Sequence, residues 1–325
     1  MSNLETEPAE IVSTGGDDIS AAIEILTPRD VPLGGPRAMG VRRTLPQRRR
    51  SLIGAWCFVD HYGPDNVSVT GGMVVPPHPH TGLQTASWLF AGEVEHRDSV
   101  GSLALVRPGE LNLMTAGAGI SHSEVSTPAT TALHGVQLWI ALPELTRHQA
   151  PRFENHVITP VTLNDVTLHV FIGSLAGQTA AALGDTPLVG AQLDLPAGAW
   201  IDLEVETSFE HGVLVDTGTV SVVGTPVRQN ELGFVEAGGG RIRVANTGHT
   251  HARVLLLGGE PLGEQIVMWW NFIGRSHDEI IAWRAQWQSD VIDGTDAGGR
   301  FGHVAYHGAA LPAPALPTVR LKPRD

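Results

Sequence analysis

The chain reads G-G-M-V-V-P-P-H-P-H over residues 71–80 and M-T-A-G-A-G-I-S-H-S-E over residues 114–124. The first segment ends on a His-x-His pair and the second ends on a His-x-Glu pair. Their four members are His78, His80, His122 and Glu124. On an extended strand, residues i and i+2 point to the same side, about 7 Å apart along the chain. If the two strands lie opposite each other inside a barrel, all four side chains can reach one ion.

Three neutral imidazoles and one carboxylate form a donor set with a defined metal preference. Such a set suits Fe(II), Mn, Ni, Co, Cu or Zn, whereas Ca and Mg prefer cages made only of oxygen. Four protein ligands on an octahedral ion leave two positions for water, dioxygen or substrate. The sequence therefore predicts one divalent metal ion at a reactive site rather than at a closed structural site.

Apolar residues over 53–160 alternate or occur in short runs, and turn residues interrupt them every several positions. This pattern is typical of antiparallel strands in a sandwich or barrel, and the stretch 83–90 is one such strand, ended by Gly92. Strand-like segments resume after the Pro-containing connection 143–160. They cover 166–172, 190–195, 200–205, 212–215, 219–223, 233–236, 242–245 and 252–257. The chain is therefore predicted to be all-β, with two successive barrels.

The clearest helix signal lies near the C-terminus. Ser276 and Glu279 form a capping-box pattern. Ile280, Trp283 and Trp287 then fall on one helical face, which predicts a helix that packs on a barrel. The following stretch is too rich in proline for regular structure, so it either wraps the surface or is disordered.

The composition excludes several classes of protein. The chain has 325 residues and a formal net charge of −13, from 34 acidic and 21 basic residues. Direct nucleic-acid binding is disfavoured, because phosphate neutralisation requires a basic excess. Cys57 is the only cysteine, which excludes a disulfide framework. We expect a cytoplasmic protein without membrane contact, since neither a secretory signal nor an apolar run of spanning length is visible.

A basic cluster surrounds Pro46. Its members are Arg42, Arg43, Arg48, Arg49 and Arg50. A solvated loop that pairs with the protein's own acidic surface explains this cluster better than an anion site does, given the net charge.

Four segments resemble the pirin family of bicupin proteins. They are P-P-H-P-H-T-G-L-Q-T at 76–85, A-G-E-V-E-H-R-D-S at 91–99, M-T-A-G-A-G-I-S-H-S-E at 114–124 and H-G-V-Q-L-W at 134–139. The resemblance implies that His78, His80, His122 and Glu124 are the metal ligands and that iron is the usual occupant. It also implies that the second barrel carries no metal. Some pirins open flavonols as quercetin 2,3-dioxygenases, whereas others are regulators that bind protein partners.

The resemblance divides the chain into four expected regions. They are a flexible acidic tail over 1–20, an N-terminal metal-binding cupin barrel over 21–150, a C-terminal cupin barrel without metal over 151–275, and a C-terminal helix with a Pro-rich tail over 276–325. Two barrels can cover each other's apolar faces, so we expect a monomer.

Two positions depart from the family pattern. Gln84 stands where pirins commonly carry Glu, so the carboxylate ligand must come from Glu124, and Gln84 is expected at most to orient a ligand. Thr81 stands where pirins commonly carry Arg, which affects how substrate is handled.

Two functions follow from this reading. The first is a quercetinase-type dioxygenase in which Glu124 is the catalytic general base for a small aromatic substrate such as a flavonol. The residues expected to receive the aromatic rings are Met73, Trp88, Met114 and Trp139. The alternative is a metal- or redox-responsive regulator without turnover, whose acidic surface fits a basic protein partner.

Other polar residues are interpreted as structural. The stretch 93–98 predicts a surface hairpin network in which His96 and Asp98 share one face. Asp60 and His61 are expected to brace a turn near the site. The second His-x-His pair, 249–251, lacks a His-x-Glu partner and is read as a solvated turn. Residues interpreted as structural, without metal or nucleophilic roles, also include His211, Ser121 and Ser123.

Overall fold

The computed structural model describes residues 23–33, 39–296 and 298–323, and the expected acidic tail over 1–20 lies outside these ranges. In these ranges the chain consists mainly of antiparallel strands arranged as two barrels, and the all-β prediction is confirmed. The helical elements of the described residues are the short α1 (Val67–Thr70), the helix α2 (His277–Trp287) and a π-helical turn over Gln288–Ile292. Over the same ranges, no helix combines the length and apolar character needed to cross a membrane.

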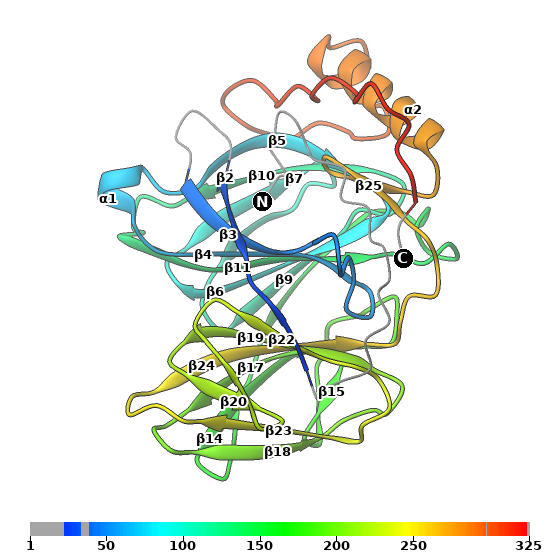
Figure 1. Cartoon of the computed structure of the whole chain (residues 1–325). Helices are drawn as coiled ribbons and strands as arrows, with labels where there is room; N and C mark the ends of the chain where they lie inside the picture. The colour runs from blue at the N-terminus through cyan, green and yellow to red at the C-terminus, as the bar shows by residue number, and fades with distance from the viewer. Residues whose placement is uncertain (1–22, 34–38, 297, 324–325) are drawn as a thin grey trace.

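The first barrel combines two sheets (Figure 1). Its seven-stranded sheet has the order β12 (Arg152–Val157), β9 (Glu110–Thr115), β6 (Leu83–Ala91), β11 (Ala132–Ala141), β4 (Trp56–Asn66), β3 (Met39–Leu45) and β2 (Arg29–Leu33). Its four-stranded sheet has the order β5 (Val74–His80), β10 (Ile120–Ser126), β7 (Val94–Asp98) and β8 (Leu103–Val106). Gly92, at a φ of 89°, allows the tight turn that ends β6, as the sequence predicts.

The second barrel repeats this arrangement. Its seven-stranded sheet has the order β1 (Glu24–Leu26), β22 (Leu232–Val235), β19 (Glu210–Thr217), β24 (Ala252–Gly259), β17 (Leu188–Leu195), β14 (Val166–Ile172) and β13 (Val161–Leu163). Its four-stranded sheet has the order β18 (Trp200–Glu204), β23 (Arg241–Asn246), β20 (Val220–Val222) and β21 (Thr225–Val227). Two short hairpins complete the strands: β15 (Ser174–Leu175) with β16 (Gln178–Thr179), and β25 (Val267–Trp269) with β26 (Phe272–Gly274).

The two seven-stranded sheets face each other across the middle of the molecule, and the four-stranded sheets lie outside (Figure 1). A continuous apolar core fills the contact between the barrels. Trp88 of β6 stacks on Phe171 of β14 with a centroid distance of 4.9 Å, and its Nε1 donates to Gln192 Oε1 at 2.8 Å. Trp56 Nε1 donates to the Gly258 carbonyl at 3.1 Å. Both tryptophans are buried, and each donates an indole hydrogen bond to the second barrel, so they stabilise the contact between the barrels.

Strand β6 is buried on both faces because it lies between two cores. Ala86 and Trp88 pack in the core between the barrels, while Leu83 and Leu89 pack inside the first barrel. The expectation that Trp88 lines the mouth of the metal-binding barrel is therefore wrong. Alternation correctly separates the two faces, but it does not say which face meets which barrel.

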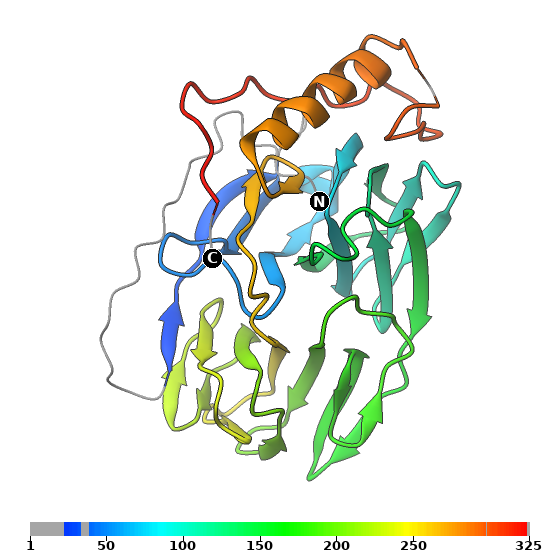
Figure 2. The same cartoon turned by 90° about the vertical axis from the view of Figure 1, so that its right-hand side faces the viewer.

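The C-terminal segment lies over the four-stranded sheet of the first barrel (Figure 2). Ser276 caps helix α2 with the predicted capping box, and the predicted apolar stripe is buried. The proline-rich segment then wraps the surface. The backbone N–H of Leu311 donates to the Pro77 carbonyl at 2.8 Å, and the Ser121 hydroxyl donates to the Phe301 carbonyl at 2.8 Å. These contacts attach the segment to β5 and β10.

The basic cluster is only in part a solvated loop. Arg43 lies in β3 with 2% of its surface exposed, and it forms a bidentate pair with Asp60 at 2.7 and 2.8 Å. The pair corrects the expectation of a solvated loop, because Arg43 is buried. It also corrects the expectation that Asp60 braces a turn, because Asp60 lies within β4. Arg50 pairs with the protein's own acidic side chains, as expected, and lies 2.9 Å from Glu24.

Candidate metal centre

The strands that carry the two pairs are direct neighbours. β5 and β10 pair antiparallel in one sheet, with His122 opposite His78. The expectation that the strands lie across the barrel from each other is therefore wrong. Side chains opposite each other on adjacent strands have Cβ atoms about 5 Å apart, which brings the pairs together more tightly than a contact across a barrel would. A register shift between His122 and Glu124 then displaces the carboxylate from the regular alternation.

Three imidazoles converge inside the barrel. The rings of His78 and His122 have a centroid distance of 4.3 Å, and each lies 5.0 Å from the ring of His80. One nitrogen of each ring lies within 4.8 Å of the others, and all three side chains are fully buried. Glu124 is also buried, and its carboxylate lies within the same distance of His96 and His122.

The hydrogen bonds of the ligand histidines determine where their protons lie. His78 Nδ1 lies 2.9 Å from the Pro76 carbonyl, and His80 Nδ1 lies 3.1 Å from the Asn271 carbonyl. A carbonyl can only accept, so both Nδ1 atoms carry the hydrogen and both Nε2 atoms keep a lone pair. This tautomer leaves Nε2 free to bind a metal ion.

The Nε2 atoms of the three histidines lie close together. His80 Nε2 lies 3.1 Å from His122 Nε2, and His78 Nε2 is buried without a hydrogen-bond partner. Burial lowers the pKa of His78 to about 3, and it lowers those of His80 and His122 well below 6.5. Ligands bonded at about 2.1 Å to one ion lie roughly 3 Å apart, which matches the 3.1 Å between His80 Nε2 and His122 Nε2. The residues present therefore fit a divalent transition metal.

A second group of potential ligands joins the barrels but has a different geometry. Asp216 Oδ1 lies 2.8 Å from His61 Nε2 and 2.6 Å from His134 Nε2, and Asp216 Oδ2 lies 3.2 Å from Arg253. The two separations from the histidines are below the roughly 3 Å expected between ligands of one ion, and all three are typical of direct hydrogen bonds and ion pairs. His61 therefore joins β4 to β19 of the other barrel, instead of bracing a turn near the site. We call this group the inter-barrel cluster.

His96 and Asp98 are buried, with 3% and 4% of their surfaces exposed. They share one face of β7, as the alternation predicts, but that face points into the barrel. Glu95 and Arg97, paired at 2.6 Å, form part of the expected surface network, together with Glu93, which lies 2.6 Å from Arg107. Sequence reasoning missed the proximity of His96 to His122, because it depends on the pairing of β7 with β10.

The two departures from the family pattern lie on different sides of the first barrel. Gln84 Nε2 donates to Thr115 Oγ1 at 2.9 Å and approaches the Leu183 carbonyl at 3.3 Å. Its side chain points away from the histidines, so the expectation that it could orient a ligand is wrong. Thr81 is buried, and its carbonyl accepts from the Ile273 N–H at 3.0 Å. The β25–β26 hairpin therefore packs next to the metal-bearing strand at this position.

Apolar and aromatic side chains surround the histidines. Trp139 presents its edge to His80 at 5.1 Å and stacks on Phe58 at 4.0 Å. Met114 packs in the same cluster as Trp139 and Phe58, and Met73 packs with Tyr62 in a separate cluster. Sequence reasoning missed Tyr62. Burial raises the pKa of its hydroxyl well above 10, and the negative charge of the nearby Glu124 adds to this.

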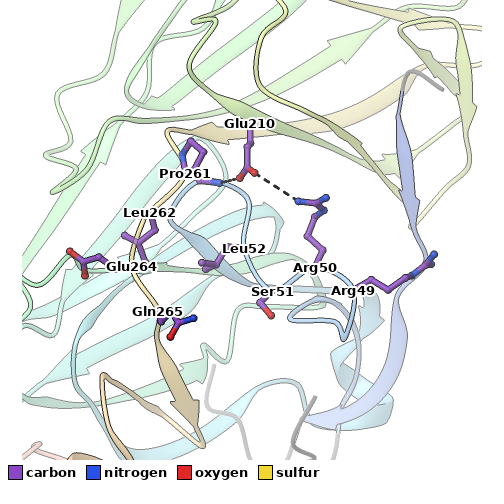
Figure 3. Close-up of a pocket in the computed structure, with 11 residues that line it drawn as sticks. Arg49, Arg50, Ser51, Leu52, Glu210, Pro261, Leu262, Glu264 and Gln265 are labelled. Carbon is purple, nitrogen blue, oxygen red and sulfur yellow. Dashed lines mark hydrogen bonds and ion pairs between the residues drawn. The ribbon is translucent and has the colours of Figure 1, made fainter. Parts of the chain in front are cut away.

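A cavity of about 440 Å³ opens at another place, between the loop 49–54 and the segment 261–265 (Figure 3). Glu210 accepts from the Gly54 N–H at 2.7 Å and lies 3.9 Å from Arg50 at its edge. No histidine lines it among the described residues, so this cavity is separate from the candidate metal centre.

The interpretations of His251, His211 and Ser121 agree with the structure. His251 has 52% of its side chain exposed, as expected for a solvated turn. His211 is buried within β19 of the second barrel. The Ser121 hydroxyl is bonded to the C-terminal segment, which does not suit a nucleophile.

Comparisons with known proteins agree with this architecture. Residues 38–140 match the Pirin family model, and residues 190–292 match the Pirin C-terminal cupin domain. The chain is 41% identical, over 91% of both chains, to a Pseudomonas aeruginosa protein provisionally named quercetin 2,3-dioxygenase. It is 33% identical to a Caulobacter vibrioides pirin-like protein, over 77% of this chain and 88% of that protein.

A solved structure has a similar fold. The crystal structure of quercetin 2,3-dioxygenase from Acinetobacter baumannii superposes with a TM-score of 0.85 at 37% identity. The match covers 92% of this chain and 98% of that chain. The duplicated barrels, the two matched domains and these relatives lead to one conclusion: the chain belongs to the pirin family of bicupin proteins.

Proposed function

We propose that the protein is a metal-dependent dioxygenase of the quercetin 2,3-dioxygenase type, with its ion held by His78, His80, His122 and Glu124. The observation that supports this most strongly is the convergence of three buried imidazoles, of which His80 Nε2 and His122 Nε2 lie 3.1 Å apart. When the hydrogens of both rings are on Nδ1, a cation between the two Nε2 atoms removes the repulsion of their lone pairs. The names of the relatives from Pseudomonas aeruginosa and Acinetobacter baumannii support the choice of reaction.

Fe(II) is the proposed ion, and Mn, Ni, Co, Cu and Zn also suit three imidazoles and one carboxylate. When bound, such an ion supplies Lewis acidity and open coordination positions for a substrate and dioxygen. The four ligand side chains are buried, so the chain excludes bulk water from the reacting groups.

Glu124 is the proposed general base. Its carboxylate lies beside His122 inside the barrel, and the Ser87 hydroxyl lies 3.4 Å from its Oε1 atom. A flavonol-like substrate has an acidic enol hydroxyl, and a buried carboxylate next to it can accept that proton. Trp139 and Met114 form an apolar wall next to His80, which favours an aromatic substrate.

The second candidate is a metal- or redox-responsive regulator that binds a protein partner without turnover. The net charge of −13 favours this candidate, because an acidic surface attracts a basic protein. Both candidates require the same ion, but only the dioxygenase consumes dioxygen with a substrate.

Anaerobic purification with metal analysis, followed by dioxygen uptake with quercetin, separates these functions. The variants are His80→Ala, which removes a proposed ligand, and His251→Ala, a control at a histidine with 52% of its side chain exposed. We expect iron near one per chain and dioxygen uptake in the wild type and in the control, and loss of both in His80→Ala. Iron without uptake would favour the regulator, whereas a wild type that binds no metal would contradict both.

A further inference from the structure

A buried histidine and a buried aspartate lie next to the candidate metal centre without belonging to its proposed ligand set. β7 pairs with β10, so that Asp98 lies opposite His122 and His96 lies opposite Glu124. These side chains point into the barrel, while Glu95 and Arg97 of the same strand face outward. The sheet therefore places an imidazole and a carboxylate directly beside His122.

The hydrogen bonds of this pair have a definite direction. Asp98 Oδ1 accepts from the backbone N–H groups of Val100 and Ser102 at 3.0 and 2.9 Å, and Asp98 Oδ2 lies 3.2 Å from His96 Nε2. An ionised carboxylate can only accept, so the hydrogen between Asp98 and His96 belongs to His96 Nε2. In a neutral His96 ring, the other nitrogen, Nδ1, is then an acceptor.

This acceptor faces the metal ligand. His96 Nδ1 lies 3.4 Å from His122 Nδ1, so a hydrogen bond between them requires the hydrogen to be on His122. His122 Nε2 is then left with its lone pair, and it points toward His80 Nε2 at 3.1 Å. Both nitrogens of His96 are occupied in this arrangement, which makes it a partner of a ligand and not a ligand itself.

His122 differs from the other two histidines in this respect. Backbone carbonyls determine the tautomers of His78 and His80, whereas a side chain occupies the same position next to His122. The ring of His96 is itself held in place, because it stacks on Phe153 with a centroid distance of 4.6 Å and an interplanar angle of 21°. The orientation of His122 can therefore be tested by substitution.

We propose that His96, oriented by Asp98, is a positioning residue that sets the tautomer and ring orientation of His122. The inference rests on the proposed metal centre, and it assigns to this chain a hydrogen-bond series Asp98–His96–His122. Partners of this kind typically contribute about 10–100-fold to metal affinity, because they orient the ligand and raise its basicity.

The test compares three substitutions of His96 by Co(II) binding. His96→Leu removes every polar contact. His96→Gln places its amide near the former Nε2 atom and loses the contact with His122, whereas His96→Asn places an amide oxygen near the former Nδ1 atom and can still accept from His122. His251→Leu is the control at an exposed histidine.

We expect Co(II) affinity, measured by chelator competition, to fall about 10–100-fold in His96→Leu and His96→Gln. The visible Co(II) spectrum should shift in both variants, and His96→Asn should restore most of the affinity and of the spectrum. A purely structural role would instead lower the thermal midpoint of the metal-free protein in all three variants, without ranking them by their acceptor.

The outcomes distinguish the role of His96 from the existence of the metal centre. Wild-type affinity and an unchanged spectrum in His96→Leu and His96→Gln would overturn the role of His96 while leaving the metal centre intact. Equal losses in His96→Asn and His96→Gln would also overturn it, because the acceptor would then have no effect. A wild type that binds no Co(II) would overturn the proposed metal centre and this inference together.

Discussion

Each converging histidine in the first barrel has its Nδ1 atom next to an acceptor, and this leaves its Nε2 atom available. The acceptors are two backbone carbonyls and one imidazole. In neutral rings, a hydrogen on each Nδ1 atom satisfies these contacts and leaves the Nε2 atoms bare. At the scale of single residues, the site is therefore arranged for a cation before any cation is bound.

Glu124→Gln tests the role of the carboxylate. The substitution keeps the size of the buried side chain and removes its charge and its ability to accept the substrate proton. We expect dioxygen uptake with quercetin to fall by about 10²–10⁴-fold, as for loss of a general base, with part of the metal retained by the imidazoles. Uptake at the wild-type rate with full metal content would exclude Glu124 from the mechanism.

The local spacing of the ligands was visible in the sequence, but their neighbours were not. His78 and His80 are two residues apart, so their shared side follows from strand geometry alone. Asn271, whose carbonyl orients His80, lies 191 residues away along the chain. No periodicity connects residues at that separation, because the contact depends on where the β25–β26 hairpin packs.

At the scale of elements, the β25–β26 hairpin supports the metal-bearing strand through a close backbone contact. Gly82 has a φ of 70°, and a Cβ atom at this position would lie 2.1 Å from the Ile273 carbonyl oxygen. The same hairpin provides the Asn271 carbonyl that contacts His80. A side chain at Gly82 would therefore push the hairpin away from β5.

Gly82→Ala should destabilise the protein more than Gly101→Ala does. Both glycines have a positive φ, but a Cβ atom at Gly101 would meet nothing within 4 Å. The two variants share the cost of the left-handed conformation, and Gly82→Ala adds overpacking of about 1–3 kcal/mol. Denaturant unfolding measures the difference, and equal stabilities would show that the hairpin moves away without cost.

Strand order was the part of the fold that the sequence could not supply. Hydrophobic alternation located β6 within one residue of its observed end, but the interpretation of Trp88 failed because both faces of this strand are buried. The same limit applies to β5 and β10, which are adjacent and not opposed. Alternation reports on the faces of one strand, whereas neighbours are determined by long-range pairing.

At the scale of the whole molecule, the inter-barrel cluster links the barrels through a charge network. His61, His134 and Arg253 surround the Asp216 carboxylate, and Arg42 adds a further positive charge nearby. Burial alone would raise the pKa of Asp216, but hydrogen bonds from His134 and His61 hold it well below its usual range. Burial lowers the pKa of His61 below 6.5.

Both shifts predict that acid weakens the union of the barrels. A carboxyl with a depressed pKa stabilises the fold above its unfolded pKa, near 4, and loses this as the pH falls toward its folded value. A histidine with a depressed pKa binds its proton more readily in the unfolded chain, so stability also falls as the pH drops below about 6.5. Asp216 and His61 therefore both lower the free energy of unfolding as the pH falls.

The variant His61→Gln isolates the histidine contribution, because its amide can still donate to Asp216 but does not titrate. We expect the wild type to be more stable near pH 7.5, and the difference in free energy of unfolding to narrow as the pH falls from 6.5 to 5. Denaturant unfolding of the metal-free proteins at several pH values measures this. A difference that is constant over the range would contradict the assigned pKa shift of His61.

The central claim concerns where the ion binds, and anomalous diffraction from crystals of the metal-loaded protein tests it most directly. Data collected at the absorption edge of the bound metal should give one strong peak between the Nε2 atoms of His78, His80 and His122, with Glu124 turned toward it. A peak at the inter-barrel cluster of His61, His134 and Asp216, or no peak among the three imidazoles, would contradict the account.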